Sequence, residues 1–235
     1  KGMRFRPTTP ILFNEPATGR DEASFVTNWL TEFTLNYNKS FGLHNLIAVA
    51  GYTLQKQNGL SNAIESNLYP NNLVPTLNAA SGITMGTSDV SSWSLISYLA
   101  RINYNYNGKY YLTTSVRTDG SSRFGVDNRF ALFPSAGLAW RISNEEFLKQ
   151  VSVLSMLKLR ASYGESGNNE IGNYRQYATI AYQKYPFGET AVGGYAPNQI
   201  PNPILTWEKQ KQFNLGVDIG FFKDRLNLTV DHFQS

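Results

Sequence analysis

The chain has little charge, no cysteine and almost no histidine. Charged residues make up 16% of its 235 residues, against about 25% in a typical soluble protein. Without cysteine, neither a disulfide nor a thiolate site can form. The two histidines, His44 and His232, are too few for a histidine-rich metal site. Neither lies in a recognisable nucleophile motif. We therefore expect no enzyme, no cofactor and no metal.

Long apolar runs are also missing. No stretch of about 18 apolar residues occurs, so the sequence predicts no transmembrane helix. Residues 1–7 lack the apolar core of a signal peptide, and the chain stops at Ser235 directly after a strand pattern. We therefore expect an internal piece of a longer protein. The net charge of +4 is small and scattered, which disfavours nucleic acid as the main partner.

The sequence does contain a strong alternation of apolar and polar residues. Between Phe213 and Phe221 every odd position is apolar, and every even position is small or polar. After the short segment 222–225 the rule restarts at Leu226. A period of two indicates β-strands with two unlike faces. Together with 14% aromatic residues and a mean hydropathy of −0.33, this pattern favours the wall of a membrane β-barrel, in which lipid-facing and lumen-facing residues alternate.

The same alternation predicts about eight strands, at residues 24–38, 45–57, 92–106, 110–119, 130–142, 156–164, 206–221 and 226–234. The connections 39–44, 107–109, 143–155 and 222–225 fall at one end, and the polar segments 58–91, 120–129 and 165–205 fall at the other. We expect one helical turn in 143–155, capped by Asn144. Tight turns at one end and long loops at the other are typical of outer-membrane barrels, whose turns face the periplasm. The predicted fold is therefore all-β, an antiparallel transmembrane β-barrel wall.

Aromatic residues gather near the predicted strand ends. They predict the aromatic girdle of a membrane barrel; ordinary cross-strand packing in a soluble sheet is the alternative. The residues concerned are Tyr104, Tyr106, Tyr110, Tyr111, Trp140, Phe221 and Phe222.

Two groups of residues are candidate contacts for a ligand. Charged residues on the predicted lumen faces could contact cargo, or they could belong to an ordinary solvated interior. Aromatic residues of the segment 165–205 could stack on sugar rings, or they could pack within the loop. The first group is Arg101, Arg117, Asp119, Arg160 and Asp218; the second is Tyr174, Tyr177, Tyr182 and Tyr185.

Several segments resemble the C-terminal half of the barrel in SusC/RagA-type TonB-linked outer-membrane transporters of Bacteroidetes. They include 97–104 (SYLARINY), 107–112 (NGKYYL), 117–125 (RTDGSSRFG), 133–141 (FPSAGLAWR) and 159–164 (LRASYG). The resemblance implies a 22-stranded barrel, an N-terminal plug, a TonB box and a SusD-type surface lipoprotein that closes over the outer mouth. No segment of this chain can be assigned to the plug or the TonB box, so residues 1–235 are interpreted as part of the barrel domain.

The resemblance implies active import across the outer membrane, energised by TonB through a region outside this chain. The cargo would be an oligosaccharide or an oligopeptide, and the partners would be the SusD-type lipoprotein and the lipid of the outer membrane. The loop aromatics could also serve as a dock for that lipoprotein. The alternative hypothesis is a non-transporting, glycan-binding β-sheet module.

Overall fold

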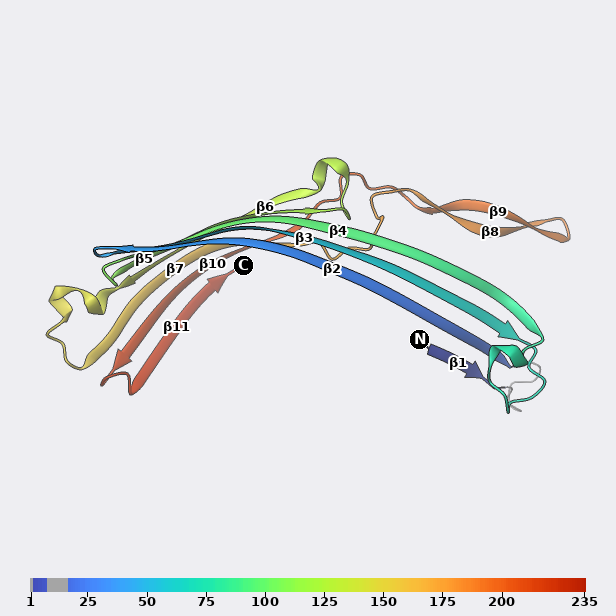
Figure 1. The fold of residues 1–235 in the computed structure, drawn as a ribbon, viewed down its shortest axis with the longest axis horizontal. Coiled ribbons are helices and arrows are strands. Elements are labelled where there is room, and N and C mark those ends of the chain that lie inside the picture. The colour runs from blue at the N-terminus through green and yellow to red at the C-terminus, as the bar shows by residue number, and fades with distance from the viewer. Residues whose placement is uncertain (1, 8–16) are drawn as a thin grey trace. The chain divides into compact units, whose positions relative to one another are not determined.

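The computed structural model describes residues 2–7 and 17–235, which form antiparallel strands almost throughout (Figure 1). One nine-stranded sheet has the order β1-β2-β3-β4-β5-β6-β7-β10-β11, and β8 pairs with β9 in a separate sheet. No helix in the described part of the chain is long and apolar enough to cross a membrane. The strands are β1 (Gly2–Arg6), β2 (Thr18–Phe41), β3 (His44–Asn67), β4 (Gly82–Tyr106), β5 (Tyr110–Ser121), β6 (Phe130–Arg141), β7 (Leu154–Asn168), β8 (Thr179–Phe187), β9 (Thr190–Gln199), β10 (Glu208–Phe221) and β11 (Leu226–Gln234).

The chain divides into two compact units. The first comprises the described residues up to Trp29 together with Lys56–Trp93, and the second comprises Leu30–Gln55 and Ser94–Ser235. Strands β2, β3 and β4 contribute residues to both units. Most candidate functional residues lie in the second unit.

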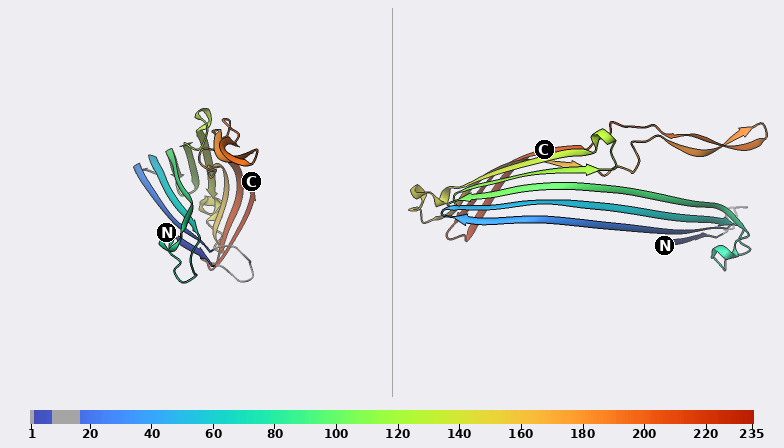
Figure 2. Two further views of the ribbon diagram at one scale, coloured as in Figure 1. Left: turned by 90° about the vertical axis from the view of Figure 1, so that its right-hand side faces the viewer. Right: turned by 45° about the horizontal axis from the view of Figure 1, so that its top comes forward.

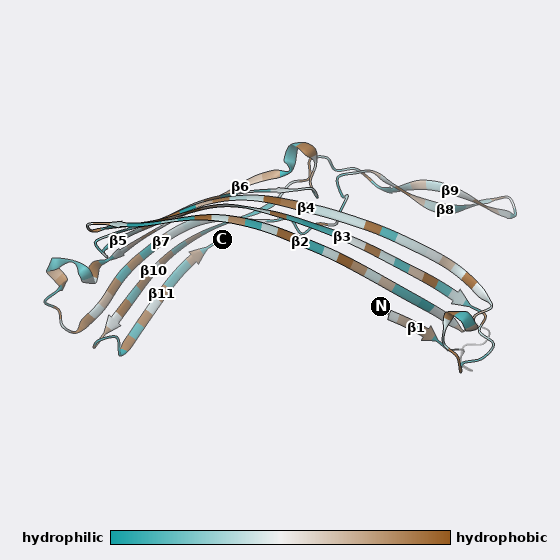
Figure 3. Cartoon of the chain, viewed as in Figure 1, coloured by the Kyte–Doolittle hydropathy of each residue, from teal (hydrophilic) through white to brown (hydrophobic). Residues whose placement is uncertain are grey.

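The strand register of the second unit confirms the predicted alternation. Val217 of β10 pairs with Leu159 of β7 on one side and with Val230 of β11 on the other. Gly216, one residue earlier, pairs with Arg160 and Asp231. Each strand therefore places apolar residues on one sheet face and polar residues on the other, as the banded colouring of β7, β10 and β11 shows (Figure 3). We call these the apolar face and the polar face.

The prediction that residues 58–91 form a long loop is wrong. Strand β3 continues to Asn67 and β4 already begins at Gly82, so the connection is only 68–81. These strand extensions are mostly polar, and their few apolar residues, such as Leu60, Ile64, Ile83 and Met85, give only a short and weak period-two signal. Side-chain hydrogen bonds help to join them: Ser88 donates to Asn62 at 2.8 Å, and Ser92 donates to Asn58 at 2.9 Å. A transmembrane strand needs about 9–11 residues, so strands of 24 and 25 residues exceed that length.

Two further elements are not predicted by the sequence pattern. Strand β1 pairs with the start of β2, with Phe5 opposite Gly19. The predicted loop 165–205 contains the hairpin β8–β9, whose turn uses Gly188 at φ +64°. With these additions the described chain has eleven strands, nine of them in the main sheet, where the sequence predicted about eight.

The tight turns are confirmed. Asn107 and Gly108 adopt φ 55° and 63°, the positive values that an Asn-Gly hairpin turn requires. The predicted helical turn in 143–155 consists of two 3₁₀ turns, Ile142–Asn144 and Glu146–Leu148. Asn144 does not cap a helix, because its side-chain amide donates instead to the carbonyl oxygen of Gly108 at 2.8 Å.

A small hydrophobic core lies at the long-loop end of the second unit. Phe124, Phe133, Trp207 and Ala131 are buried together, with Leu95, Ile171 and Leu205 packed against them. The Trp207 indole donates to the carbonyl oxygen of Arg129 at 2.8 Å. This core fastens the connections 122–129 and 169–207 to each other and to the sheet, while β8–β9 extends beyond it (Figure 2).

Candidate functional site

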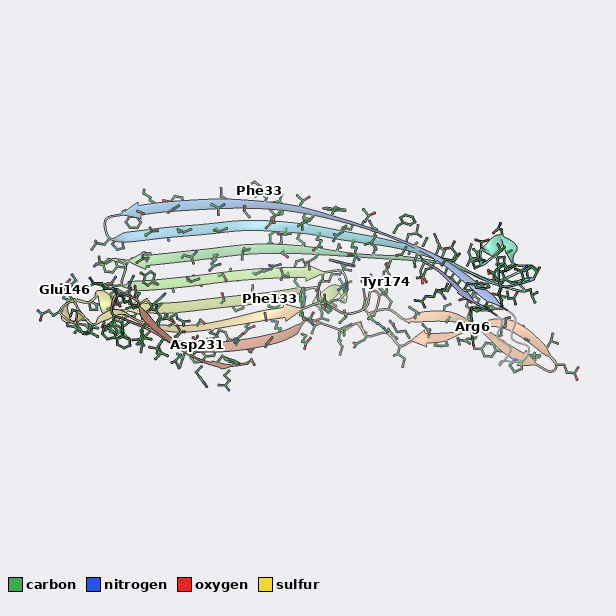
Figure 4. All side chains as sticks on the ribbon, turned by 90° about the horizontal axis from the view of Figure 1, so that it is seen from below. Arg6, Phe33, Phe133, Glu146, Tyr174 and Asp231 are labelled. Atoms are coloured by element: carbon green, nitrogen blue, oxygen red, sulfur yellow. The ribbon has the colours of Figure 1, made fainter. Side chains whose placement is uncertain are left out.

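The polar face of the second unit carries an ion-pair network on its last three strands. The Arg160 guanidinium from β7 donates to both carboxylate oxygens of Asp218, at 2.8 and 2.9 Å. It also donates to Asp231 of β11 at 3.0 Å, and Thr229 donates to Asp218 at 3.2 Å. Register explains the arrangement, because Arg160 and Asp231 both pair with Gly216 of β10. Figure 4 labels Asp231 on β11.

A second ion pair lies on the same face, on β5. Arg117 donates to the two oxygens of Asp119 at 2.7 and 3.0 Å, and to the Ser97 hydroxyl of β4 at 3.2 Å. Asp119 is only 8% exposed. Arg101 pairs with Ser115 on the same face and belongs to neither of these two ion pairs.

The structure therefore joins four of the five predicted charged residues into two pairs. Two contributors were missed, Asp231 and Thr229, although the alternation in 226–230 already placed them on the polar side. A groove between the two pairs is lined mostly by small and polar residues. They include Thr113, Ser135, Gly137, Ser162, Gly164 and Asn214.

Aromatic rings form a row at the short-turn end of the second unit. Phe41 stacks on His44 at 5.1 Å, and His44 lies 4.8 Å from Tyr106. Tyr110 follows at 6.4 Å from Tyr106, and Trp140 at 6.2 Å from Tyr110. These centroid distances join β2 to β6 across five adjacent strands. A continuous row at one end of the strands is the arrangement expected of an interfacial belt.

Glu145 fastens the connection 142–153 to this row. Its carboxylate accepts from the Lys109 ammonium at 2.7 Å, the Tyr110 hydroxyl at 2.7 Å and the Trp140 indole at 3.1 Å. The hydrogen bonds from Lys109, Tyr110 and Trp140 lower the pKa of Glu145 to about 2. Glu146, labelled in Figure 4, marks the same connection.

The four predicted loop tyrosines do not form a single platform. Tyr182 and Tyr185 lie on opposite faces of the β8–β9 hairpin, since they are three residues apart in one strand. Tyr182 meets Tyr195 edge-on at 6.0 Å and covers Gly193, whereas Tyr185 covers Gly194.

Tyr174 and Tyr177 lie at the base of the hairpin. Their carbonyl oxygens accept from the Gln199 side chain at 3.1 and 2.8 Å. All four rings are partly exposed, between 42% and 57%. Tyr174 marks this region beyond the strand ends in Figure 4.

No group of three or more His, Cys, Asp or Glu residues within the described chain could hold a metal ion. The candidate site consists of the polar face and the β8–β9 hairpin. With its geometry defined, comparison with known proteins identifies the family. The sequence model of the family described as "TonB dependent receptor-like, beta-barrel" matches residues 4–235.

The chain belongs to this family. TonB-dependent receptor P3 of Formosa agariphila is 38% identical over 236 residues, covering 98% of this chain. TonB-dependent receptor SusC of Bacteroides thetaiotaomicron is 42% identical over 143 residues, 59% of this chain. A solved structure described as the RagAB peptide transporter matches 98% of this chain with a TM-score of 0.86 and 31% identity.

These relatives are much longer than the present chain, which spans 23% of receptor P3, 14% of SusC and 26% of the RagAB chain. The TonB-dependent receptor barrel is an outer-membrane structure, and the present sheet is a section of such a wall. The sequence resemblance to SusC/RagA-type receptors is therefore confirmed. The relatives are receptors and transporters, not enzymes.

Proposed function

We propose that this chain forms part of the wall of an active outer-membrane importer. Its apolar face contacts lipid, and its polar face lines the lumen. The observation that carries the proposal is the alternation of apolar and polar residues between the two faces, within a TonB-dependent receptor barrel. Leu138, Leu215 and Val230 on the apolar face are 61%, 45% and 56% exposed. The hydrocarbon of a bilayer would remove these apolar side chains from contact with water, which is favourable.

The cargo in this proposal is an oligosaccharide or an oligopeptide, taken up with energy supplied through TonB. A SusD-type lipoprotein binds at the long-loop end, where the β8–β9 hairpin presents exposed apolar side chains. The similarity to SusC and to the RagAB peptide transporter supports this class of cargo and partner. In the lumen, Arg101, Arg117, Asp119, Arg160 and Asp218 contact the cargo or the plug beside the groove of small residues.

Uptake measurements test the proposal. A strain that carries the full-length gene should accumulate labelled oligopeptides or oligosaccharides from a defined pool, and a gene deletion should abolish uptake of one class. A TonB-deficient strain should show the same loss, because the transport step is energised. Undiminished uptake of every pool member by the deletion strain would contradict the proposal.

A non-transporting glycan-binding module is the second candidate. It is favoured by Tyr182, Tyr185 and Tyr195, which are exposed on the hairpin and could stack on sugar rings. This alternative predicts that residues 1–235 are soluble and folded without detergent. A wall section should aggregate in water, because its apolar face lacks a cover. A solubility trial with circular dichroism separates the two candidates.

A further inference from the structure

The connection between β6 and β7 exposes apolar side chains at the short-turn end of the second unit. Phe147, Val151 and Val153 are 69%, 44% and 48% exposed. Single exposed apolar residues are normal on protein surfaces, but a group of them within one short connection marks an interaction surface. Some partner therefore covers this connection.

Hydrogen bonds hold the start of the connection at the edge of the apolar face. Trp140 follows Leu138 by two residues in β6, so both side chains lie on that face. Tyr110 pairs in register with Trp140 and shares the same face. The Tyr110 hydroxyl and the Trp140 indole donate to the Glu145 carboxylate at 2.7 and 3.1 Å. The connection is thus fastened to side chains of the face that contacts lipid in our proposal.

The turn between β10 and β11 adds another exposed ring beside this connection. Phe222 is 57% exposed, and its amide donates to the carbonyl oxygen of Val153 at 2.9 Å. The Asp224 amide donates to the Ser155 hydroxyl at 3.0 Å. Phe222, Lys223 and Asp224 have φ values of 56°, 58° and 61°, which residues other than glycine rarely adopt. Such strained backbone is found preferentially at functional sites.

Two cations of the same turn are available to a ligand. Lys223 and Arg225 are exposed, and neither forms an ion pair with a carboxylate of residues 2–7 and 17–235. Asp224 lies between them, but its carboxylate turns toward the polar face, where Oδ1 would be 2.6 Å from a Cβ at Gly220. Exposed apolar side chains beside unpaired cations are the two features that bind a protein to the surface of an anionic bilayer.

We propose that residues 145–153 and 222–225 form a lipid anchor, which binds the periplasmic leaflet of the outer membrane. Phe147 and Phe222 enter the boundary between head groups and acyl chains, while Lys223 and Arg225 bind lipid phosphates. A bilayer fits better than a periplasmic protein, because the rings that hold Glu145 belong to the apolar face. The inference rests on the proposed contact of that face with lipid.

Photo-crosslinking of the full-length protein in cells tests the anchor. Benzoylphenylalanine in place of Phe147 should form lipid adducts on illumination, detected by radioactive phosphate and identified by mass spectrometry. The same probe at Leu138 is the reference for lipid contact, and at the exposed Lys184 of the β8–β9 hairpin it should form no lipid adduct. The anchor is overturned if position 147 gives only protein adducts, or none, while position 138 gives lipid adducts.

The choice of lipid tests the two cations. In vesicles of phosphatidylcholine and phosphatidylglycerol, the adducts at position 147 should be enriched in the anionic lipid. Lys223→Gln and Arg225→Gln should each reduce this enrichment about fivefold, the contribution of one cation near an anionic bilayer. Lys184→Gln is the matched control and should leave the enrichment unchanged. An enrichment that survives both substitutions would contradict the assignment of lipid phosphates to this turn.

Failure of the anchor is distinguishable from failure of the import proposal. Lipid adducts at position 147 without any nutrient uptake would preserve the anchor and reject the importer. Normal uptake with only protein adducts at position 147 would do the reverse.

Discussion

An arginine placed on the apolar face near the middle of β10 should strongly destabilise the barrel. Strand β10 carries its apolar positions from Phe213 to Phe221, with Val217 midway. At about 3.4 Å per residue, eight steps span about 27 Å along the strand. A tilt of about 40° reduces this to roughly 21 Å along the membrane normal, close to the apolar band of about 25 Å. Val217 therefore lies near the bilayer midplane.

At that depth Val217→Arg should cost about 2–4 kcal/mol, because hydrocarbon cannot solvate the charge. The ratio of folded to unfolded protein then falls by roughly 30-fold to 700-fold. Denaturant titration of the full-length protein refolded into liposomes measures this change.

The polar face supplies the control. Gly216, adjacent to Val217, is unsuitable, because a Cβ there would collide with the Asp231 carboxylate and lie 2.8 Å from the Arg160 guanidinium. Asn214 is better: its side-chain amide donates to Ser162 at a long 3.4 Å and accepts from Gln212. Asn214→Arg should cost about 1 kcal/mol or less. Leu215 lies one residue away, at nearly the same depth in the membrane but on the apolar face. Comparing Leu215→Arg with Asn214→Arg therefore tests the effect of the face alone. Equal costs for Asn214→Arg and Leu215→Arg would refute the assignment of faces.

Three further predictions concern the loops and their attachments. Gly167→Ala should cost about 1–3 kcal/mol of folding stability, because the new Cβ would collide with the buried Phe133 ring. Gly120→Ala should cost less, because its Cβ meets the Phe130 ring, which is 58% exposed and can move. Thermal melts of the two variants measure the difference. The folded-state pKa of Glu145, about 2, lies below its ordinary 4.5, so its contribution is complete above about pH 4.5 and is lost as the pH falls toward 2. Hydrogen exchange of 142–153, corrected for intrinsic rates, should show this loss, and Glu145→Gln should abolish the pH dependence. Gln199→Ala should accelerate exchange at 174–177, because it removes the donor to two carbonyl oxygens there, while exchange in β10 stays constant.

The part of the fold that could be predicted is the part with two unlike faces. Strands β10 and β11 match their predicted bounds within two residues, because apolar and polar residues alternate along 208–221 and 226–234. The extensions of β3 and β4 carry only a weak signal of this kind, because polar residues dominate them. Asn62 and Ser88, for example, are joined across the strands by a side-chain hydrogen bond, and the composition of the extensions resembles that of a loop.

The candidate site was predictable to the extent that it depends on register. The period of two placed Arg160 and Asp218 on one face, and pairing across β7 and β10 then brought them into contact. The loop tyrosines were different, because their arrangement depends on an unforeseen hairpin. A turn at Gly188 puts Tyr182 and Tyr185 on opposite faces, which proximity in sequence alone does not reveal.

Two different sources of stability follow from where the buried residues lie. In the second unit the buried hydrophobic residues gather at the long-loop end, around Phe124 and Trp207, and the wall itself is one layer thick. A single sheet has no opposing layer on which to bury its apolar face, so in our proposal lipid must supply the cover. The hydrophobic core at the long-loop end, by contrast, is stabilised by packing and by hydrogen bonds such as the one from the Trp207 indole to the carbonyl oxygen of Arg129. Substitutions in that core should therefore loosen the loops and leave membrane insertion of the wall intact, because insertion depends on the apolar face alone.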